Sequence, residues 1–304
     1  MMNYKNLLIF LLLITAASCK QKTETKKTTI QKNGIHVAIL LYPGVELLDF
    51  SGPAEVFSNA KGFDVYTVST AGKSIATKNG TLKITADYTL DNAPQPDIIV
   101  VPGGPEDAIK PVTTNQNTMS WLKKASLKTR LTMSVCTGAE ILGKAGILEN
   151  KTATTHQAAL DTLQSRYKNT RFVKDVRFVE DGKVITTAGV SAGIDGALYV
   201  VEKLKGLKEA LFVTLLMQYD KWKPGDGMII GAKTITEAHP NLSATEEKAQ
   251  QNEVLPSDGN DIVCGMMLKK GNKITYRYKG KLYGFCSPGC KKLFVNHPET
   301  YTSK

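Results

Sequence analysis

Residues 131–138 read Leu-Thr-Met-Ser-Val-Cys-Thr-Gly. The run through Cys136 lacks the polar alternation of a half-exposed strand, which predicts a strand buried on both faces. Thr137 and Gly138 then turn the chain into a helix, and a strand–turn–helix elbow exposes its central side chain at the edge of a sheet. A helix N-terminus beside a thiol favours the thiolate. Cys136 is therefore a candidate nucleophile, and the alternative is a small buried hydrophobic residue.

The same order of apolar run, turn and helix recurs on both sides of this elbow. Such alternation predicts an α/β fold, a doubly wound parallel sheet with ligands at the carboxyl ends of its strands. Strands are expected at residues 36–42, 63–69, 98–101, 131–136 and 184–188, with a further hairpin strand within 171–181. Helices are expected at residues 53–59, 118–128, 138–144, 156–167, 192–205 and 207–219.

The composition of the chain excludes several classes of protein. A chain of 304 residues is long enough for about two domains, and its 42% hydrophobic content excludes wholesale disorder. The formal charge of +11 is spread thinly, without an Arg-rich helix or an aromatic-interleaved groove, so nucleic-acid binding is not expected. Five cysteines are too few for a disulfide framework in a chain of this size.

The N-terminal segment has the pattern of an export signal. A short basic start precedes an apolar run at residues 7–14, which is shorter than the ~20 residues of a membrane-spanning helix. Small residues then lead to Cys19, an arrangement that resembles a bacterial lipobox, although Ala16 stands where Leu is usual. We expect a signal peptide at residues 1–18, acylation of Cys19, a flexible tether at residues 19–33 and a lipid-anchored place in the bacterial cell envelope. A plain secretory signal is the alternative.

Further motifs accompany the elbow. Residues 48–53 read Leu-Asp-Phe-Ser-Gly-Pro, residues 102–104 read Pro-Gly-Gly, residues 153–156 read Ala-Thr-Thr-His, and residues 189–195 read Gly-Val-Ser-Ala-Gly-Ile-Asp. With these motifs, residues 34–220 resemble the ThiJ/PfpI family of the class I glutamine-amidotransferase-like superfamily. The resemblance implies a flavodoxin-like fold, a small-molecule substrate and, as in many members, a homodimer.

The Leu-Asp-x-x-Gly-Pro segment is similar to the isonitrile-hydratase branch of that family. In that branch the residues that match Asp49, Cys136 and Thr137 are catalytic, which implies hydration of an isonitrile-like molecule without an organic cofactor. Cys136 would attack the isonitrile carbon and Asp49 would move the proton. The Gly104 N–H and the Thr137 backbone would stabilise developing charge. His156 is a further site candidate, unless it only caps the next helix.

Several polar residues have competing interpretations. Asp49 could instead cap the following helix, with Ser51 competing for that role. Glu46 is the candidate if the site is of the family's other type, in which a glutamate hydrogen-bonds the cysteine. Asp195 is expected to be a structural hydrogen-bonding residue. Gln157 stands where the branch often carries an aromatic residue, which implies a different pocket wall.

The end of the chain is a different unit. In residues 221–258 the apolar residues show no sustained helical or strand spacing, so we expect a linker there. Residues 259–304 predict a hairpin at 274–285 and a helix that begins near Cys286. The Val-Cys-Gly-Met and Tyr-Gly-Phe-Cys-Ser-Pro-Gly-Cys runs in this unit resemble a YHS domain, a small metal-associated α+β module.

Three cysteines of this unit are candidate metal ligands. Cys286 and Cys290 lie four residues apart and would share one helix face, whose N-terminus favours thiolates, and Cys264 precedes them. These soft ligands fit Zn²⁺ or Cu(I), with a fourth donor from His297, Met266 or water. The alternatives are a disulfide or purely structural thiols.

Two functions of different classes follow from these patterns. The first is an exported lipoprotein that hydrates a small electrophilic molecule at Cys136 and carries a metal-binding module. The second is a non-catalytic envelope protein that binds metal or senses oxidants, with Cys136 as a redox thiol.

Overall fold

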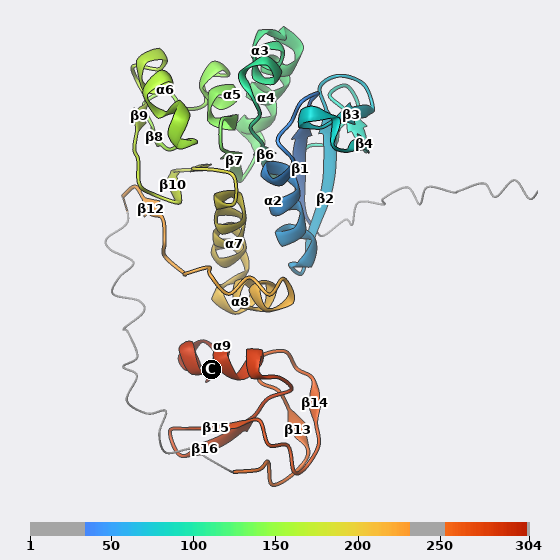
Figure 1. The fold of residues 1–304 in the computed structure, drawn as a ribbon, viewed down its shortest axis with the longest axis vertical. Coiled ribbons are helices and arrows are strands. Elements are labelled where there is room, and N and C mark those ends of the chain that lie inside the picture. The colour runs from blue at the N-terminus through green and yellow to red at the C-terminus, as the bar shows by residue number, and fades with distance from the viewer. Residues whose placement is uncertain (1–33, 232–252, 303–304) are drawn as a thin grey trace, which may run out of the picture. The chain divides into compact units, whose positions relative to one another are not determined.

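The computed structural model describes residues 34–231 and 253–302 (Figure 1). The expected signal peptide, the tether and Cys19 lie outside these ranges. Within them, none of the helices combines the length and the apolar character needed to cross a bilayer.

An α/β domain occupies residues 34–231. Its strands are β1 (Ile35–Leu41), β2 (Phe63–Ser69), β3 (Ser74–Ala76), β4 (Lys83–Thr85), β5 (Tyr88–Thr89), β6 (Ile98–Val101), β7 (Leu131–Val135), β8 (Thr152–Ala153), β9 (Arg171–Phe172), β10 (Phe178–Asp181), β11 (Val184–Thr187) and β12 (Met228–Ile229). Its helices are α2 (Leu47–Asn59), α3 (Glu106–Thr114), α4 (Gln116–Lys128), α5 (Gly138–Lys144), α6 (Leu160–Arg166), α7 (Ala192–Lys205) and α8 (Leu207–Leu216).

The central sheet has eight strands in the order β12-β10-β11-β7-β6-β1-β2-β5. Neighbouring strands are parallel except β10 and β11, which form an antiparallel hairpin. Every residue of β6, β7 and β11 is buried, as expected for strands covered on both faces. Helix α2 packs against α7, and α3 packs against α4 and α5. The predicted α/β class is confirmed.

The order β11-β7-β6-β1 brings four strand ends to one edge of the sheet. Because these strands are parallel, their carboxyl ends point the same way. The segments that follow them carry Asp49 after β1, Gly103 after β6, Cys136 after β7 and Gly189 after β11. The topology therefore gathers the candidate site from four separate parts of the chain.

Helix α2 differs from its prediction in a way that matters for the site. It begins at Leu47, whereas the sequence predicted a start at Pro53, because proline favours a first helical turn. Asp49 therefore lies within the first turn, and the N-cap residue is Glu46, which makes no side-chain cap bond. Ser51 Oγ donates to the Leu47 carbonyl at 2.8 Å. Capping by Asp49 or Ser51 was therefore a wrong interpretation.

Other boundaries also differ from the predictions. Helix α3 was not predicted, and it contains Pro111, a residue that disfavours helix interiors. The helix expected at residues 156–167 is a short 3₁₀ turn, Gln157–Ala159, followed by α6. Strand β9 pairs with β8 in a separate ribbon, so only β10 forms the predicted hairpin with β11. Strand β12, inside the expected linker, pairs with β10 at the edge of the sheet.

The C-terminal module contains two small ribbons and two helices. Its elements are β13 (Gly259–Asn260), β14 (Met267–Leu268), β15 (Thr275–Tyr278), β16 (Lys281–Gly284), α9 (Pro288–Asn296) and α10 (Pro298–Thr302). The predicted hairpin is present, and Lys279 and Gly280 form its turn with positive φ angles. The ring of Phe294 is buried among aromatic rings of the hairpin and of α10. One aromatic cluster thus supplies the core of this module.

Candidate active site and candidate metal site

The elbow at Cys136 is held by backbone bonds and by close contact. Cys136 has a φ of +56°, in the left-handed region that non-glycine residues rarely adopt. Its N–H donates to the Thr187 carbonyl at 3.1 Å, and Thr155 Oγ1 donates to its carbonyl at 2.8 Å. A Cβ on Gly138 would lie 2.1 Å from the Val101 carbonyl oxygen, so only glycine fits there. This arrangement is the predicted strand–turn–helix elbow.

Asp49 lies beside the Cys136 thiol. The residue is fully buried, its Oδ2 accepts the Gly103 N–H at 3.0 Å, and its Oδ1 has no hydrogen-bond partner among the described residues. Burial raises the pKa of Asp49 to about 7, assisted by the charge of Glu46 and opposed by the Gly103 N–H. Burial and the neighbouring Asp49 raise the pKa of Cys136 to about 12.

These pKa values correct the expectation of a resting thiolate. Hydrogen bonds from Thr137 at the start of α5 do lower the pKa of Cys136, but desolvation and Asp49 outweigh them. The raised pKa favours the neutral thiol near pH 7, so a nucleophilic role of this sulfur would require a neighbouring base. A carboxyl group with a pKa near 7 suits that task, because it is often ionised at neutral pH yet still basic enough to accept a proton.

Thr137 is bound to the loop that follows β6. Its Oγ1 donates to the Gly104 carbonyl at 2.7 Å and accepts the Gly104 N–H at 3.0 Å. The N–H that was expected to stabilise developing charge is therefore already paired in this structure. A Cβ on Gly103 would lie 2.6 Å from Thr137 Oγ1, so this approach requires glycine. The buried Tyr42 hydroxyl donates to the Pro102 carbonyl at 2.8 Å and anchors the start of the loop.

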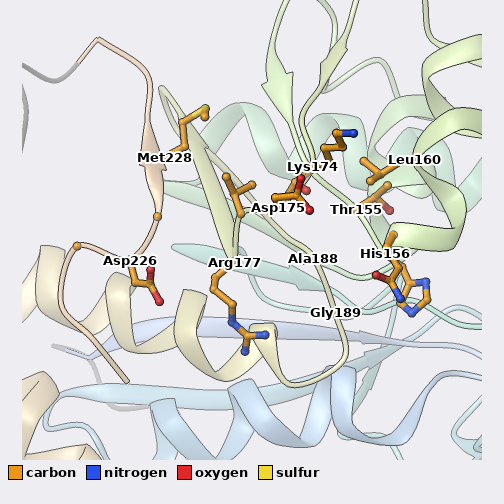
Figure 2. A pocket seen from close by; sticks show the side chains of 15 residues that line it. Thr155, His156, Leu160, Lys174, Asp175, Arg177, Ala188, Gly189, Asp226 and Met228 are labelled. Atoms are coloured by element: carbon orange, nitrogen blue, oxygen red, sulfur yellow. The ribbon is translucent and has the colours of Figure 1, made fainter. Parts of the chain in front are cut away.

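An open pocket of about 750 Å³ lies beside the segment that follows β11, and none of the elbow residues Cys136, Thr137 and Gly138 lines it (Figure 2). Thr155 and His156 line one side, and Asp226 and Met228 line the other. Gly189 also lines it, and a Cβ on Gly189 would lie 3.0 Å from the Cys136 sulfur. A volume of this size suits a small molecule.

His156 caps a helical turn, which was the alternative to a site role, and its side chain also faces a pocket. It caps the 3₁₀ turn, where its Nδ1 accepts the Ala158 N–H at 3.3 Å, and it also lines the pocket. The structure therefore brings His156 to the pocket, whereas Asp49, Thr137 and Gly104 gather at the elbow itself.

Glu46 and Asp195 are engaged with other side chains. Glu46 Oε2 lies 2.8 Å from Lys78 Nζ. The charge of Glu46 raises the pKa of Asp49, and the charge of Lys78 lowers it. Asp195 accepts hydrogen bonds from Arg177 and from the Tyr219 hydroxyl, as expected of a structural residue.

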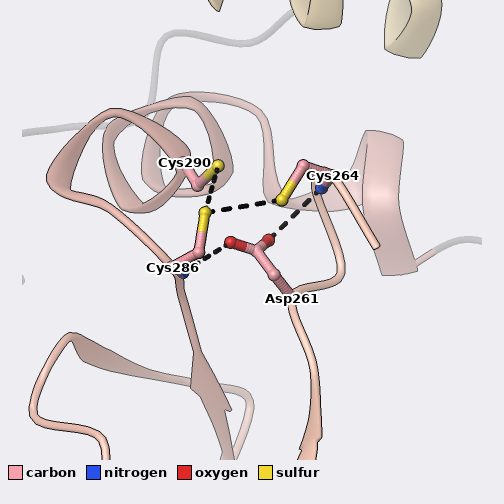
Figure 3. A group of neighbouring side chains, drawn as sticks. All are labelled: Asp261, Cys264, Cys286 and Cys290. Carbon is pink, nitrogen blue, oxygen red and sulfur yellow. Dashed lines mark hydrogen bonds between the residues drawn. The ribbon is translucent and has the colours of Figure 1, made fainter. Parts of the chain in front are cut away.

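The second cluster of functional groups lies in the C-terminal module (Figure 3). Candidate ligand atoms of Asp261, Cys264, Cys286 and Cys290 all lie within 4.8 Å of one another. The Cys286 sulfur is 3.5 Å from the sulfurs of Cys264 and of Cys290. All three thiols are free rather than disulfide-bonded. This donor set suits a thiophilic ion.

Helix α9 corrects the expected placement of two ligands. It begins at Pro288 after the Ser287 cap, so Cys286 precedes the helix and does not share a helix face with Cys290. Burial raises the pKa of both thiols, so the start of α9 alone does not ionise them. The two sulfurs nevertheless lie close together, because the end of β16 places Cys286 just before the start of α9.

Asp261 is the member of the cluster that sequence reasoning missed. Burial acts to raise the pKa of Asp261, but N–H donors from Cys286 and Val263 outweigh it and hold the pKa below its ordinary value. His297, an expected fourth ligand, ends α9 and is not part of this cluster. The signal was present in the sequence as an aspartate three residues before Cys264, a spacing that lets its carboxylate accept backbone N–H groups of the same turn.

Comparisons with known proteins agree with this organisation. Residues 35–203 match the DJ-1/PfpI family, and residues 260–304 match the YHS domain. The chain is 34% identical to an isonitrile hydratase of Pseudomonas putida over 192 residues, which are 63% of this chain and 82% of that protein. It is 29% identical to the HTH-type transcriptional regulator CdhR of Pseudomonas aeruginosa, over 58% of this chain and 52% of the regulator.

A solved structure gives the same result for the fold. A ThiJ/PfpI family protein from Pseudomonas syringae superimposes with a TM-score of 0.58 at 28% identity, covering 63% of this chain and 77% of that one. The elbow, the strand order and the extent of the sequence match show that this chain belongs to the DJ-1/PfpI family and carries a YHS domain after it.

Proposed function

We propose that the DJ-1/PfpI domain hydrates a small isonitrile-like molecule, with Cys136 as nucleophile and Asp49 as proton carrier. The observation that carries the proposal is the buried pair itself, a thiol at a strained elbow beside a carboxyl group whose pKa is about 7. The 34% identity to an isonitrile hydratase supports the choice of substrate class.

The reaction adds one water molecule to the isonitrile and gives an N-substituted formamide. Cys136 Sγ bonds to the terminal carbon while Asp49 takes the thiol proton and passes it to that carbon, which yields a thioimidate. Water then attacks the same carbon while Asp49 takes one of its protons, and Asp49 passes that proton to the nitrogen, which leaves a hydroxyl group on the carbon. Finally the carbon–sulfur bond breaks as the hydroxyl becomes the formamide carbonyl, and the hydroxyl proton passes through Asp49 to the sulfur. Thr137 orients the loop that carries Gly103, whose N–H holds the Asp49 carboxyl.

We further propose that the YHS domain binds Zn²⁺ or Cu(I) through Cys264, Cys286 and Cys290. The close approach of three free thiols supports this assignment. Bound metal would supply folding energy to a module with a small core.

The place of the protein in the cell is also a proposal. The N-terminal pattern supports export and acylation of Cys19 in a bacterial envelope. The family resemblance supports a homodimer.

The test of the hydratase proposal is conversion of simple alkyl and aryl isonitriles to formamides by the purified protein. We expect turnover in the wild type, none in Cys136→Ala, and unchanged turnover in Cys264→Ser, the matched control that removes a thiol elsewhere. Equal turnover by wild type and Cys136→Ala would contradict the mechanism.

Oxidant sensing is the competing function, and the geometry disfavours it. A buried thiol with a raised pKa holds little of the thiolate that peroxide attacks. Mass spectrometry after mild peroxide measures the difference. A stable Cys136 sulfinate together with no turnover of any isonitrile would favour sensing.

A further inference from the structure

The Asp261 carboxylate lies among the thiols, yet its oxygens are occupied by backbone groups (Figure 3). Oδ1 accepts the Val263 N–H at 2.8 Å and the Cys264 N–H at 3.4 Å. Oδ2 accepts the Cys286 N–H at 2.7 Å. The residue is 1% exposed, so these bonds are shielded from water. Two of the three donors belong to the proposed ligands themselves.

Asp261 also closes the loop that presents Cys264. Its N–H donates to the Met266 carbonyl at 2.8 Å, and its carbonyl accepts the Gly265 N–H at 2.7 Å. Its side chain then connects this loop to Cys286, 25 residues further along the chain. One residue therefore sets the distance between two cysteines that come from separate segments.

We propose that Asp261 is a positioning residue outside the coordination shell, and that three thiolates alone hold the metal. The inference rests on the metal binding proposed above. Oδ1 already accepts two N–H groups, those of Val263 and Cys264. If Oδ2 bound the ion, it would weaken its bond to Cys286, whose sulfur is needed as a ligand. Carboxylates that orient ligands in this way are common in metal sites.

A shell of three thiolates selects the class of ion. Cu(I) is soft and is satisfied by three sulfur donors, whereas Zn²⁺ prefers four ligands and would have to add a water molecule. Cys264 and Cys286 are partly exposed, whereas Cys290 is buried. We expect Cu(I) to bind more tightly than Zn²⁺.

The test is X-ray absorption of the whole protein loaded with Cu(I) alone or with Zn²⁺ alone, together with chelator competition. We expect three sulfur scatterers and no oxygen or nitrogen around Cu(I). Asp261→Ala should lower the affinity for both ions by a similar factor of about 10–100 and leave the number of sulfur ligands unchanged. Asp258→Ala is the matched control, because Asp258 also accepts a backbone N–H, that of Lys270 at 2.8 Å, but lies outside the cluster. The affinities of Asp258→Ala for both ions should equal those of the wild type.

Two results would overturn the assignment. One is an oxygen scatterer around Cu(I) in the wild type, and the other is a loss of Zn²⁺ affinity in Asp261→Ala with Cu(I) affinity retained. The wild-type spectrum decides the question even if Asp261→Ala fails to fold. Failure of the reduced wild type to bind either ion would instead remove the proposed metal function, and the inference with it.

Discussion

The two cysteine sites of this protein are built on different principles. At the elbow, one thiol is buried against one carboxyl group, and burial raises both pKa values, so both groups are costly to ionise. In the YHS domain, the carboxylate of Asp261 is satisfied by three N–H groups and keeps a low pKa. The difference teaches that a carboxylate left partly without donors can exchange protons, whereas one saturated with donors serves as a fixed support.

The largest expected effect tests the proton role of Asp49. Asp49→Asn keeps an acceptor for the Gly103 N–H but cannot take a proton, so isonitrile turnover should fall about 10²–10⁴-fold. In the wild type kcat/KM should decline as the pH falls through about 7, because the carboxylate becomes protonated. Steady-state rates between pH 5 and 9 measure both effects. A wild-type rate that is flat across this range would remove Asp49 from the proton transfer.

The next test addresses the metal site and leaves the elbow intact. Cys286→Ser removes the sulfur that lies 3.5 Å from each of the other two, so bound metal per chain should fall from near one to near zero. Elemental analysis after purification without chelator measures the loss. Cys136→Ala is the matched control and should retain the metal. Loss of metal in the control as well would mean that the two sites are not independent.

A smaller effect concerns stability at the elbow. The native pKa of Asp49 is about 7, against 3.8 for the unconstrained group, so the folded state binds this proton more tightly than the unfolded state does. Stability should therefore fall as the pH rises from about 4 to about 7, and Asp49→Asn should remove this loss. Above pH 7 the removal of this loss should make Asp49→Asn more stable than the wild type by at most about 4 kcal/mol. The limit follows because each unit of difference between the folded and unfolded pKa contributes about 1.4 kcal/mol. Urea unfolding at pH 5 and pH 8 tests the sign, and a variant that is less stable than the wild type at pH 8 would contradict it.

The smallest effect is expected at Thr137. Thr137→Val removes the Oγ1 that bonds both the N–H and the carbonyl of Gly104, and we expect about a tenfold loss of kcat from a looser loop. Thr137→Ser keeps the hydroxyl and should restore most of the rate. Equal losses in both variants would show that the methyl group, and not the hydrogen bonds, is what the site needs.

Much of this site could be predicted from local sequence. The run of buried residues up to Cys136, followed by Thr137-Gly138, is a local pattern, and so is the aromatic hairpin before Cys286. Local pattern failed at α2, because Pro53 favoured a later helix start than packing against α7 allows. It also missed α3, which contains Pro111 in its interior.

By itself the sequence determined the α/β class, the strand–turn–helix elbow at Cys136, the presence of three cysteines in the C-terminal unit and the pairing of a DJ-1/PfpI domain with a YHS domain, because these depend on residue type and local pattern. Only the tertiary structure decided the strand order, the raised pKa values of Asp49 and Cys136, and the contacts of Asp261. The physical reason is that desolvation and hydrogen bonding depend on neighbours from distant segments. Asp49 and Asp261 are the same residue type, and only their surroundings give one a raised pKa and the other a lowered one.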